Sequence, residues 1–121
     1  MKLHELAAQI KIDPRKLTEY ALNPQSLRGR HKAIIFEHRL GYTLENYQLL
    51  LQQMQTLAPL AEVSLHSEDE FGKRYTADLQ IEGVTERRAI VRTGWFLPME
   101  SDEIRLATLW VYKEIENDTE T

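Results

Sequence analysis

Hydrophobic and polar positions follow two different periods along this chain, and the change between them falls near residue 60. Before it, apolar residues recur every three or four positions, as on one face of a helix. After it they alternate with polar residues, as in a strand with one face buried. Helices followed by strands indicate an α+β fold, in which the helices cover one face of a sheet.

The first half of the chain predicts three N-terminal helices, over residues 14–22, 30–40 and 44–58. Asp13 can cap the first of them, and Pro14 suits its first turn. Gly41 supplies a C-terminal stop for the second. The third begins after Thr43, which is a capping residue, and ends before Pro59.

The second half predicts a three- to four-stranded antiparallel sheet. "RYTADLQIE" (74–82) alternates cleanly and has one wet face, whereas "RRAIVRTGWF" (87–96) and "IRLATLWVY" (104–112) are apolar on both sides and fit central positions. "AEVSLH" (61–66) can add a fourth strand. The one-sided strands leave an edge on which a second copy can pair, so the oligomeric state stays open.

The length of 121 residues corresponds to one domain, 1–121. Residues 1–12 predict no definite element, and residues 114–121 form an acidic tail that we expect to be mobile. Cysteine is absent, which excludes disulfides, zinc–thiolate sites and thiol catalysis. Neither a signal peptide nor a segment of membrane-spanning length is present, so we expect a cytoplasmic protein without membrane partners.

Charge is distributed unevenly along the chain. The formal net charge is −4, yet the stretch from Arg15 to Arg39 holds six Lys or Arg against two Glu. The glycines form no phosphate-binding loop of known spacing. The four histidines lack the spacing of metal ligands, and the acidic stretch 68–70 lacks the pattern of a calcium loop. We therefore expect no metal and no cofactor.

The start of the helix over 30–40 is a candidate anion site. Arg28, Arg30 and Lys32 crowd the helix N-terminus, where positive charge opposes the helix dipole. A bound phosphate would reverse the sign of that interaction. The alternative is an ordinary amphipathic helix, with Ala33, Phe36 and Leu40 buried and its charged side chains in water.

Two arginines of the strands are candidates for the same site. If the inner face of the sheet carries Val91 and Thr93, Arg92 must point to the opposite face, because neighbours on a strand alternate. Arg105 joins it if the inner positions of the last strand are Leu106, Thr108 and Trp110. Each arginine is either paired with a carboxylate, such as Asp78 for Arg92, or aimed at a ligand. Trp95 and Trp110 are interpreted as core or rim aromatics.

The stretches "LTEYALNPQSLRGRHKAIIFEHRLGYTLENYQLLLQQ", "FGKRYTADLQIEG", "AIVRTGW" and "RLATLWV" resemble an uncharacterised bacterial domain family. That family is found both freestanding and as the C-terminal effector module of contact-dependent-inhibition and other polymorphic toxins. The resemblance extends over nearly all of residues 17–111. The matching positions are Leu17, Tyr20, Asn23, Pro24, Gly29, Lys32, Ala33, Phe36, Leu40, Gly41, Asn46, Gly72, Tyr75, Gly83, Val91, Arg92, Thr93, Trp95, Arg105, Leu106 and Thr108.

The resemblance implies a toxin-like function. Toxin modules built from helices and then an antiparallel sheet often belong with the barnase, EndoU and RelE-like ribonucleases, which need no metal; this is an analogy of fold. On it, RNA is the substrate and a cognate antitoxin or immunity protein is the partner. The residues then assigned are His31 or Lys32 for proton transfer, Arg92 and Arg105 as phosphate clamps, Thr93 or Thr108 as a hydroxyl donor, and Arg28 and Arg30 for phosphate binding.

A difficulty and an alternative remain. Arg92 and Thr93 are neighbours and face opposite ways, so both can serve one site only if a bulge intervenes, for instance at Gly94. The alternative function is a non-catalytic protein-binding module, either antitoxin-like or a degenerate toxin domain. It predicts that Arg92 and Arg105 are neutralised by carboxylates of the chain, whereas a nuclease predicts that they converge unpaired with Lys32 or His31 in one cleft.

Overall fold

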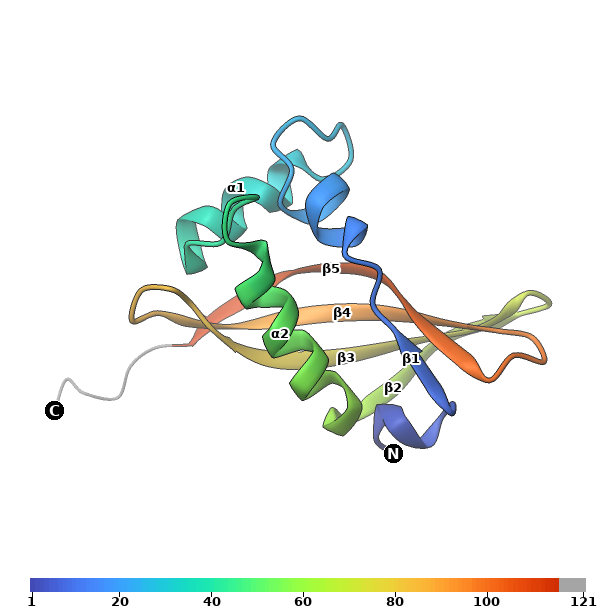
Figure 1. Ribbon diagram of the computed structural model, residues 1–121. Helices are drawn as coiled ribbons and strands as arrows, with labels where there is room; N and C mark the ends of the chain where they lie inside the picture. The colour runs from blue at the N-terminus through green and yellow to red at the C-terminus, as the bar shows by residue number, and fades with distance from the viewer. Residues whose placement is uncertain (116–121) are drawn as a thin grey trace, which may run out of the picture.

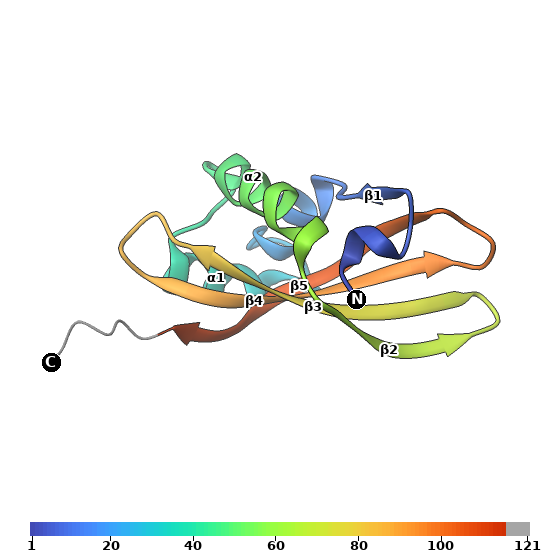
Figure 2. The same cartoon turned by 90° about the horizontal axis from the view of Figure 1, so that it is seen from below.

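Helical segments lie on one face of a twisted sheet in the computed structural model, which describes residues 1–115 (Figure 1). Figure 2 shows α2 on one side of the strands, and among the described residues no helix covers the other side. The elements in chain order are η1 (Leu3–Glu5), β1 (Gln9–Lys11), η2 (Leu17–Ala21), α1 (Arg30–Leu40), α2 (Tyr47–Leu57), η3 (Ala58–Leu60), β2 (Val63–Asp69), β3 (Gly72–Glu82), β4 (Arg88–Pro98) and β5 (Glu103–Ile115).

The sheet has five strands in the order β1-β5-β4-β3-β2. Strands β2 to β5 form an antiparallel meander, and β2 confirms the strand expected around "AEVSLH". The expectation of a three- to four-stranded, purely antiparallel sheet is wrong, because β1 adds a fifth strand that pairs in parallel with β5. Its three residues are too few to show a period, so residues 1–12 gave no signal in the sequence.

The N-terminal helices are confirmed, with changed bounds. α1 matches the prediction, and Gly41 ends it in the left-handed region at φ 78°, where its N–H bonds to the carbonyl of Glu37. α2 begins at Tyr47, later than expected, because Asn46 and Thr43 first close a turn through a bond of 2.8 Å. The helix predicted over 14–22 is shortened to the π-helical η2. Of the tail expected to be mobile over 114–121, Glu114 and Ile115 instead belong to β5, and the rest, from 116 onward, lies outside the described residues.

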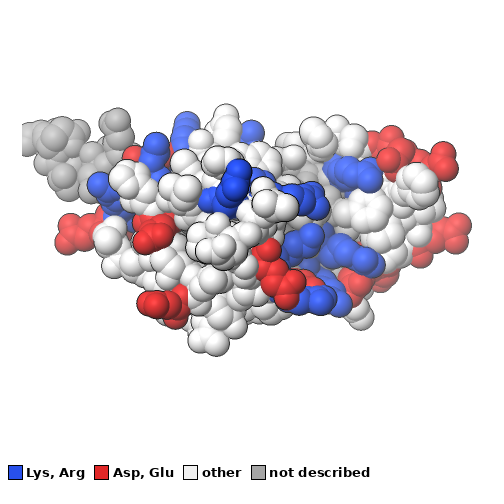
Figure 3. All heavy atoms as spheres, turned by 90° about the horizontal axis from the view of Figure 1, so that it is seen from above, with Lys and Arg blue, Asp and Glu red and all other residues white. Residues whose placement is uncertain are grey.

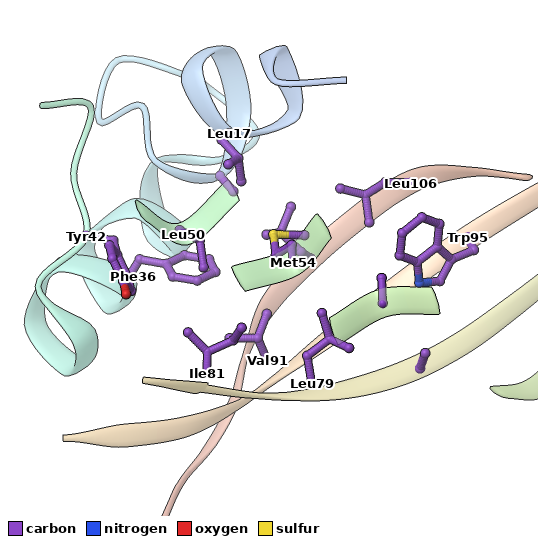
Figure 4. Close-up of a cluster of buried hydrophobic side chains, with 14 of the residues drawn as sticks. Leu17, Phe36, Tyr42, Leu50, Met54, Leu79, Ile81, Val91, Trp95 and Leu106 are labelled. Carbon is purple, nitrogen blue, oxygen red and sulfur yellow. The ribbon is translucent and has the colours of Figure 1, made fainter. Parts of the chain in front are cut away.

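The core lies between α2, η2 and the inner face of the sheet (Figure 4). Leu79 and Ile81 of β3 are buried while Asp78 and Gln80 are exposed, so the alternation read from the sequence is confirmed. Each fully buried Leu, Ile or Phe side chain contributes about 1.5–3 kcal/mol to folding. The fully buried large side chains are Leu3, Leu17, Leu22, Phe36, Leu40, Tyr42, Leu50, Met54, Leu79, Ile81, Trp95 and Ile104.

Two sets of side-chain hydrogen bonds hold α2 on the sheet and β3 against β4. Gln53 of α2 donates to the carbonyl of Glu82 at 2.8 Å and accepts from its N–H at 2.8 Å, which ties α2 to the end of β3. Thr93, which is fully buried, donates to the carbonyl of Ala77 at 2.6 Å and accepts from the indole N–H of Trp95 at 2.7 Å. These bonds satisfy polar groups that would otherwise be buried without partners.

Candidate functional site

Three polar side chains from distant parts of the chain meet where α1 lies against β5. Lys32, in the first turn of α1, donates hydrogen bonds to the phenol oxygen of Tyr20 in η2 and, at 3.1 Å, to Oγ1 of Thr108 in β5. The Tyr20 and Thr108 oxygens are themselves 3.0 Å apart. We call these residues the Tyr20–Lys32–Thr108 cluster.

A glycine brings α1 close enough to η2 to form this cluster. A Cβ atom at Gly29 would lie 1.9 Å from the carbonyl oxygen of Tyr20, so no other residue fits there without moving the backbone. The N–H of Gly29 also bonds to Oγ of Ser26 at 3.0 Å. Lys32 starts one turn further on, within reach of the Tyr20 phenol.

A β-bulge in β5 places the third residue of the cluster. Gly94 of β4 pairs with Thr108 and Trp95 pairs with Leu106, which leaves Ala107 as the extra residue of β5. Leu106 and Leu109 can therefore both face the core, where they are 2% and 0% exposed. The expectation that Thr108 and Trp110 face inward is wrong, because the bulge reverses the alternation of β5 after Ala107. The bulge lies opposite Gly94, the residue at which the sequence suggested one.

The cluster has hydrogen-bond donors to spare. An ammonium group has three N–H donors, and Lys32 uses two of them on Tyr20 and Thr108. One hydroxyl proton is shared between the Tyr20 and Thr108 oxygens, so the other remains available. An anion placed next to the cluster can thus accept one N–H and one O–H bond.

The electrostatics of the cluster favour negative charge. The pKa of Tyr20 lies below its ordinary value. Burial raises it, but this effect is outweighed by the hydrogen bonds with Lys32 and Thr108 and by the nearby positive charges of Lys32 and Arg28, which together lower it by more. The Lys32 ammonium lies 4.7 Å from the Tyr20 ring centroid, and the Arg28 guanidinium carbon 6.0 Å from it. Within residues 1–115, no carboxylate forms an ion pair with Lys32 or Arg28.

A polar pocket of about 340 Å³ opens beside Tyr20 and Arg28. One of its arginines, Arg15, is paired with a carboxylate, since it donates to both oxygens of Asp13, with the shortest distance 2.7 Å. That hydrogen bond lowers the pKa of Asp13 to about 2. Lys16 and Glu19 also line the pocket. Figure 3 shows several Lys and Arg side chains gathered near the middle of the helix side of the molecule, with Asp and Glu side chains next to them and toward both ends.

An apolar trough lies on the other side of Lys32. Its volume is about 510 Å³, and it is lined by His31, Lys32, Ile35, Trp110 and Val111. His31 and Ile35 are exposed, and the Lys32 ammonium is 5.2 Å from the centroid of the Trp110 ring. The trough exists because β1 pairs with β5 only from Glu103 to Arg105, so that farther along α1 takes the place of a neighbouring strand.

The arginines expected to clamp a phosphate do not join the cluster. Arg92 lies on the outer face of the sheet, where it bonds to both oxygens of Asp78 at 2.8 and 3.0 Å and stacks on Tyr112. The hydrogen bond with Asp78 raises the pKa of Arg92. Arg105 lies 3.6 Å from the carboxylate of Glu103. The two arginines thus have acidic neighbours in their own chain and do not converge with Lys32.

The remaining sequence candidates divide between the site and the fold. Lys32 and Thr108 are in the cluster, with Arg28 above it and His31 beside it. Arg30 is exposed at the start of α1. Thr93 is far from solvent and its hydroxyl is used within the core, so it cannot donate to a ligand in this conformation.

Tyr20 is the member of the cluster that the candidate list missed. It belongs to the positions that carry the family resemblance, as Lys32 and Thr108 do, but a tyrosine twelve residues before a lysine has no recognisable spacing. Its place among those matching positions is the one signal in the sequence that pointed to it.

One of three comparisons with known proteins gives a match. A family model described as a domain of unknown function, DUF6883, matches residues 2–113. The chain belongs to this family. Neither the search of curated proteins nor the search of solved structures gives a match. The DUF6883 match agrees with the resemblance to an uncharacterised domain and covers every residue of the Tyr20–Lys32–Thr108 cluster.

Over residues 1–115, no three His, Asp or Glu side chains are grouped so that they could hold a metal ion. None of the helices described has both the length and the apolar character needed to cross a bilayer.

Proposed function

We propose that this DUF6883 domain is a toxin-like endoribonuclease, and that the Tyr20–Lys32–Thr108 cluster is its catalytic centre. The observation that carries the proposal is the Lys32 ammonium, held between two hydroxyl groups with one N–H donor unused. An ammonium fixed in this way is suited to the charge that develops on a phosphate during cleavage. Arg28, which lies over the Tyr20 ring, adds a second positive charge.

The residues present can supply each proton transfer of metal-independent RNA cleavage. The ribose 2′-oxygen attacks the neighbouring phosphorus and gives its proton to a base. The bond from phosphorus to the 5′-oxygen then breaks, and that oxygen takes a proton from an acid. We assign the base to His31, because it lines the trough beside Lys32 and its imidazole can accept a proton. We assign the acid to Tyr20, because its phenol has a lowered pKa and a bound ammonium. Thr108 positions Tyr20 and Lys32 through its hydrogen bonds to both.

The proposed centre differs from the one suggested by the family resemblance. Arg92 and Arg105 stay outside it, since each has a carboxylate neighbour, and Arg30 is kept as an outer contact for the RNA backbone. The resemblance to toxin effector modules supports RNA as the substrate and an immunity-type protein as the partner, on the level of fold analogy. No cofactor enters the proposed reaction.

A non-catalytic protein-binding module is the second candidate. Two observations favour it: the pairing of Arg92 with Asp78, and the exposed apolar side chains Leu27 and Ile34, which are 84% and 59% exposed near α1. Exposed apolar residues that gather on one surface often mark a protein interface.

Incubation of the purified protein with total RNA, with and without EDTA, tests the proposal. We expect cleavage that EDTA does not suppress. Lys32→Met and Tyr20→Phe should each reduce the rate about 10²-fold or more. Lys73→Met, an exposed lysine of β3, serves as the matched control and should retain the wild-type rate. Intact RNA after incubation with the wild type, or equal rates for Lys32→Met and the control, would overturn the ribonuclease and leave the binding module.

A further inference from the structure

The apolar trough beside Lys32 has the composition of a site for a flat, uncharged ring attached to an anion. Ile35 and Val111 give it aliphatic walls, and Trp110 gives it an aromatic surface. Lys32 stands at the boundary between the trough and the Tyr20–Lys32–Thr108 cluster, so one ligand can touch the apolar trough and the cationic cluster together.

Trp110 is held in place by the sheet, and its ring is open to a ligand. It pairs with Arg92 across β4 and β5, and the bulge at Ala107 turns its side chain to the outer face of the sheet. The chain's other tryptophan, Trp95, is 1% exposed and belongs to the core. Trp110 is half-buried and lies at the part of β5 that no strand covers within residues 1–115. An indole at such an edge presents an aromatic surface without exposing a core residue.

We propose that the trough is a nucleobase subsite, which holds the base of the nucleotide whose phosphate lies at the Tyr20–Lys32–Thr108 cluster. The proposal rests on the proposed function and names its substrate more closely, as single-stranded RNA. In a nucleotide, one ribose separates the base from the phosphate. The indole and the Lys32 ammonium are neighbours at 5.2 Å, so a base against Trp110 brings its own phosphate to the cluster. Contacts between bases and aromatic side chains tolerate any sequence, because every base has a π face.

Charge argues for this occupant over a second copy of the chain. The cations at the site are Lys32 and Arg28, and no carboxylate of residues 1–115 is paired with either. A second copy would bring the same positive surface to the same place by symmetry, and like charges would repel. A nucleotide brings one negative charge and one flat ring, which match the two halves of the site.

Tryptophan fluorescence gives a direct test, since Trp110 is half-buried at the trough whereas Trp95, the other of the chain's two tryptophans, is enclosed in the core. The probes are a deoxyadenosine dinucleotide, which lacks the 2′-hydroxyl and cannot be cleaved, and ribose 5-phosphate, which lacks a base. We expect quenching by the dinucleotide and not by ribose 5-phosphate.

Trp110→Phe, which keeps an aromatic ring, should bind the dinucleotide but lose the quenching. Trp110→Ala should weaken binding about tenfold, measured by displacement of a labelled dinucleotide. Lys32→Met should weaken binding of both probes.

The outcomes separate this inference from the proposed function. Equal responses to both probes, quenching that persists in Trp110→Phe, or dinucleotide affinity unchanged in Trp110→Ala would each overturn the subsite. A fluorescence change on raising the protein concentration alone would also overturn it, because the trough would then bind a second copy. Base-dependent binding without RNA cleavage would uphold the subsite and remove the catalytic role. RNA cleavage whose KM is unchanged in Trp110→Ala would uphold the ribonuclease and remove the subsite.

Discussion

Lys32 in the first turn of α1 donates a hydrogen bond to Thr108 in β5 at 3.1 Å, across 76 positions of sequence. That bond joins the N-terminal helices to the last strand beside the Tyr20 phenol. Because Lys32 also donates to Tyr20, its ammonium contributes to the lowered pKa of the phenol. The chemistry of the site therefore depends on a contact between the two halves of the chain.

Lys32→Met is expected to raise the pKa of Tyr20. Desolvation by burial, which acts upward, would then no longer be opposed by the Lys32 hydrogen bond and charge. Ultraviolet titration of tyrosinate absorbance, with Tyr20→Phe subtracted to isolate the signal, measures the change. A Tyr20 pKa that stays the same or falls in Lys32→Met would contradict the contact on which the site is built.

Gly29→Ala should separate α1 from η2. The added methyl would meet the carbonyl oxygen of Tyr20 at 1.9 Å, so the backbone of one segment must shift. We expect a loss of about 1–3 kcal/mol in the free energy of unfolding, as for overpacked sites, together with a loss of RNA cleavage. Denaturant unfolding measures the first effect. Gly94→Ala is a comparison for unfolding stability alone, because its added methyl would meet only the side-chain methyl of Thr108, a residue of the cluster, at 2.9 Å and no backbone atom. Equal stability of Gly29→Ala and the wild type would refute the close approach.

Most of the fold could be predicted from the sequence, because burial leaves a period in it. The helix over 30–40 and the alternation of β3 follow from one buried face each, and Gly41 was recognisable as a stop. β1 could not be predicted, since a three-residue parallel edge strand has no period and depends on pairing with β5. The bulge at Ala107 reversed the faces of Thr108 and Trp110, although the glycine opposite it was a visible sign.

Less of the candidate site could be predicted. Lys32, Thr108 and Arg28 were named from charge and from the family resemblance, and the structure brings them together. Tyr20 was missed because its importance comes from its distance to Lys32, which sequence spacing does not encode. For Arg92 and Arg105 the sequence left two outcomes open, pairing with carboxylates or convergence with Lys32, and in the structure each has a carboxylate neighbour.

Arg92→Ala is expected to leave RNA cleavage close to the wild-type rate. The guanidinium is held by Asp78 on the outer face of the sheet, so its removal takes away a partly exposed ion pair. We expect Arg92→Ala to lower the free energy of unfolding by about 0–1 kcal/mol. In a protein that already carries Asp78→Ala, Arg92→Ala should cost less, because the ion pair is already broken. A 10²-fold decrease in cleavage rate would instead place Arg92 in the catalytic centre.

Thr93→Val should destabilise the protein without changing the cluster. Valine keeps the shape of threonine, but it leaves the buried indole N–H of Trp95 without an acceptor. The expected cost is about 1–3 kcal/mol in the free energy of unfolding. Denaturant unfolding measures it, and RNA cleavage below the melting transition should remain. A loss of cleavage at unchanged stability would assign the Thr93 hydroxyl a catalytic role.

RNA binding should weaken as salt is added, and the slope reports how many phosphates the protein contacts. Lys32, Arg28 and Lys16 lie along one path from the trough to the polar pocket, and in residues 1–115 none of them is paired with a carboxylate. If all three bind phosphates, the logarithm of affinity should fall with the logarithm of salt concentration at a slope of ~2–3. Lys16→Met should lower that slope by about one, because one counterion fewer is released. Lys73→Met should leave it unchanged, since that lysine lies on β3 away from the path. Fluorescence anisotropy of a labelled deoxyoligonucleotide, measured at several salt concentrations, gives the slope for each variant. A flat profile would show that phosphates are not the ligand and would favour a protein partner.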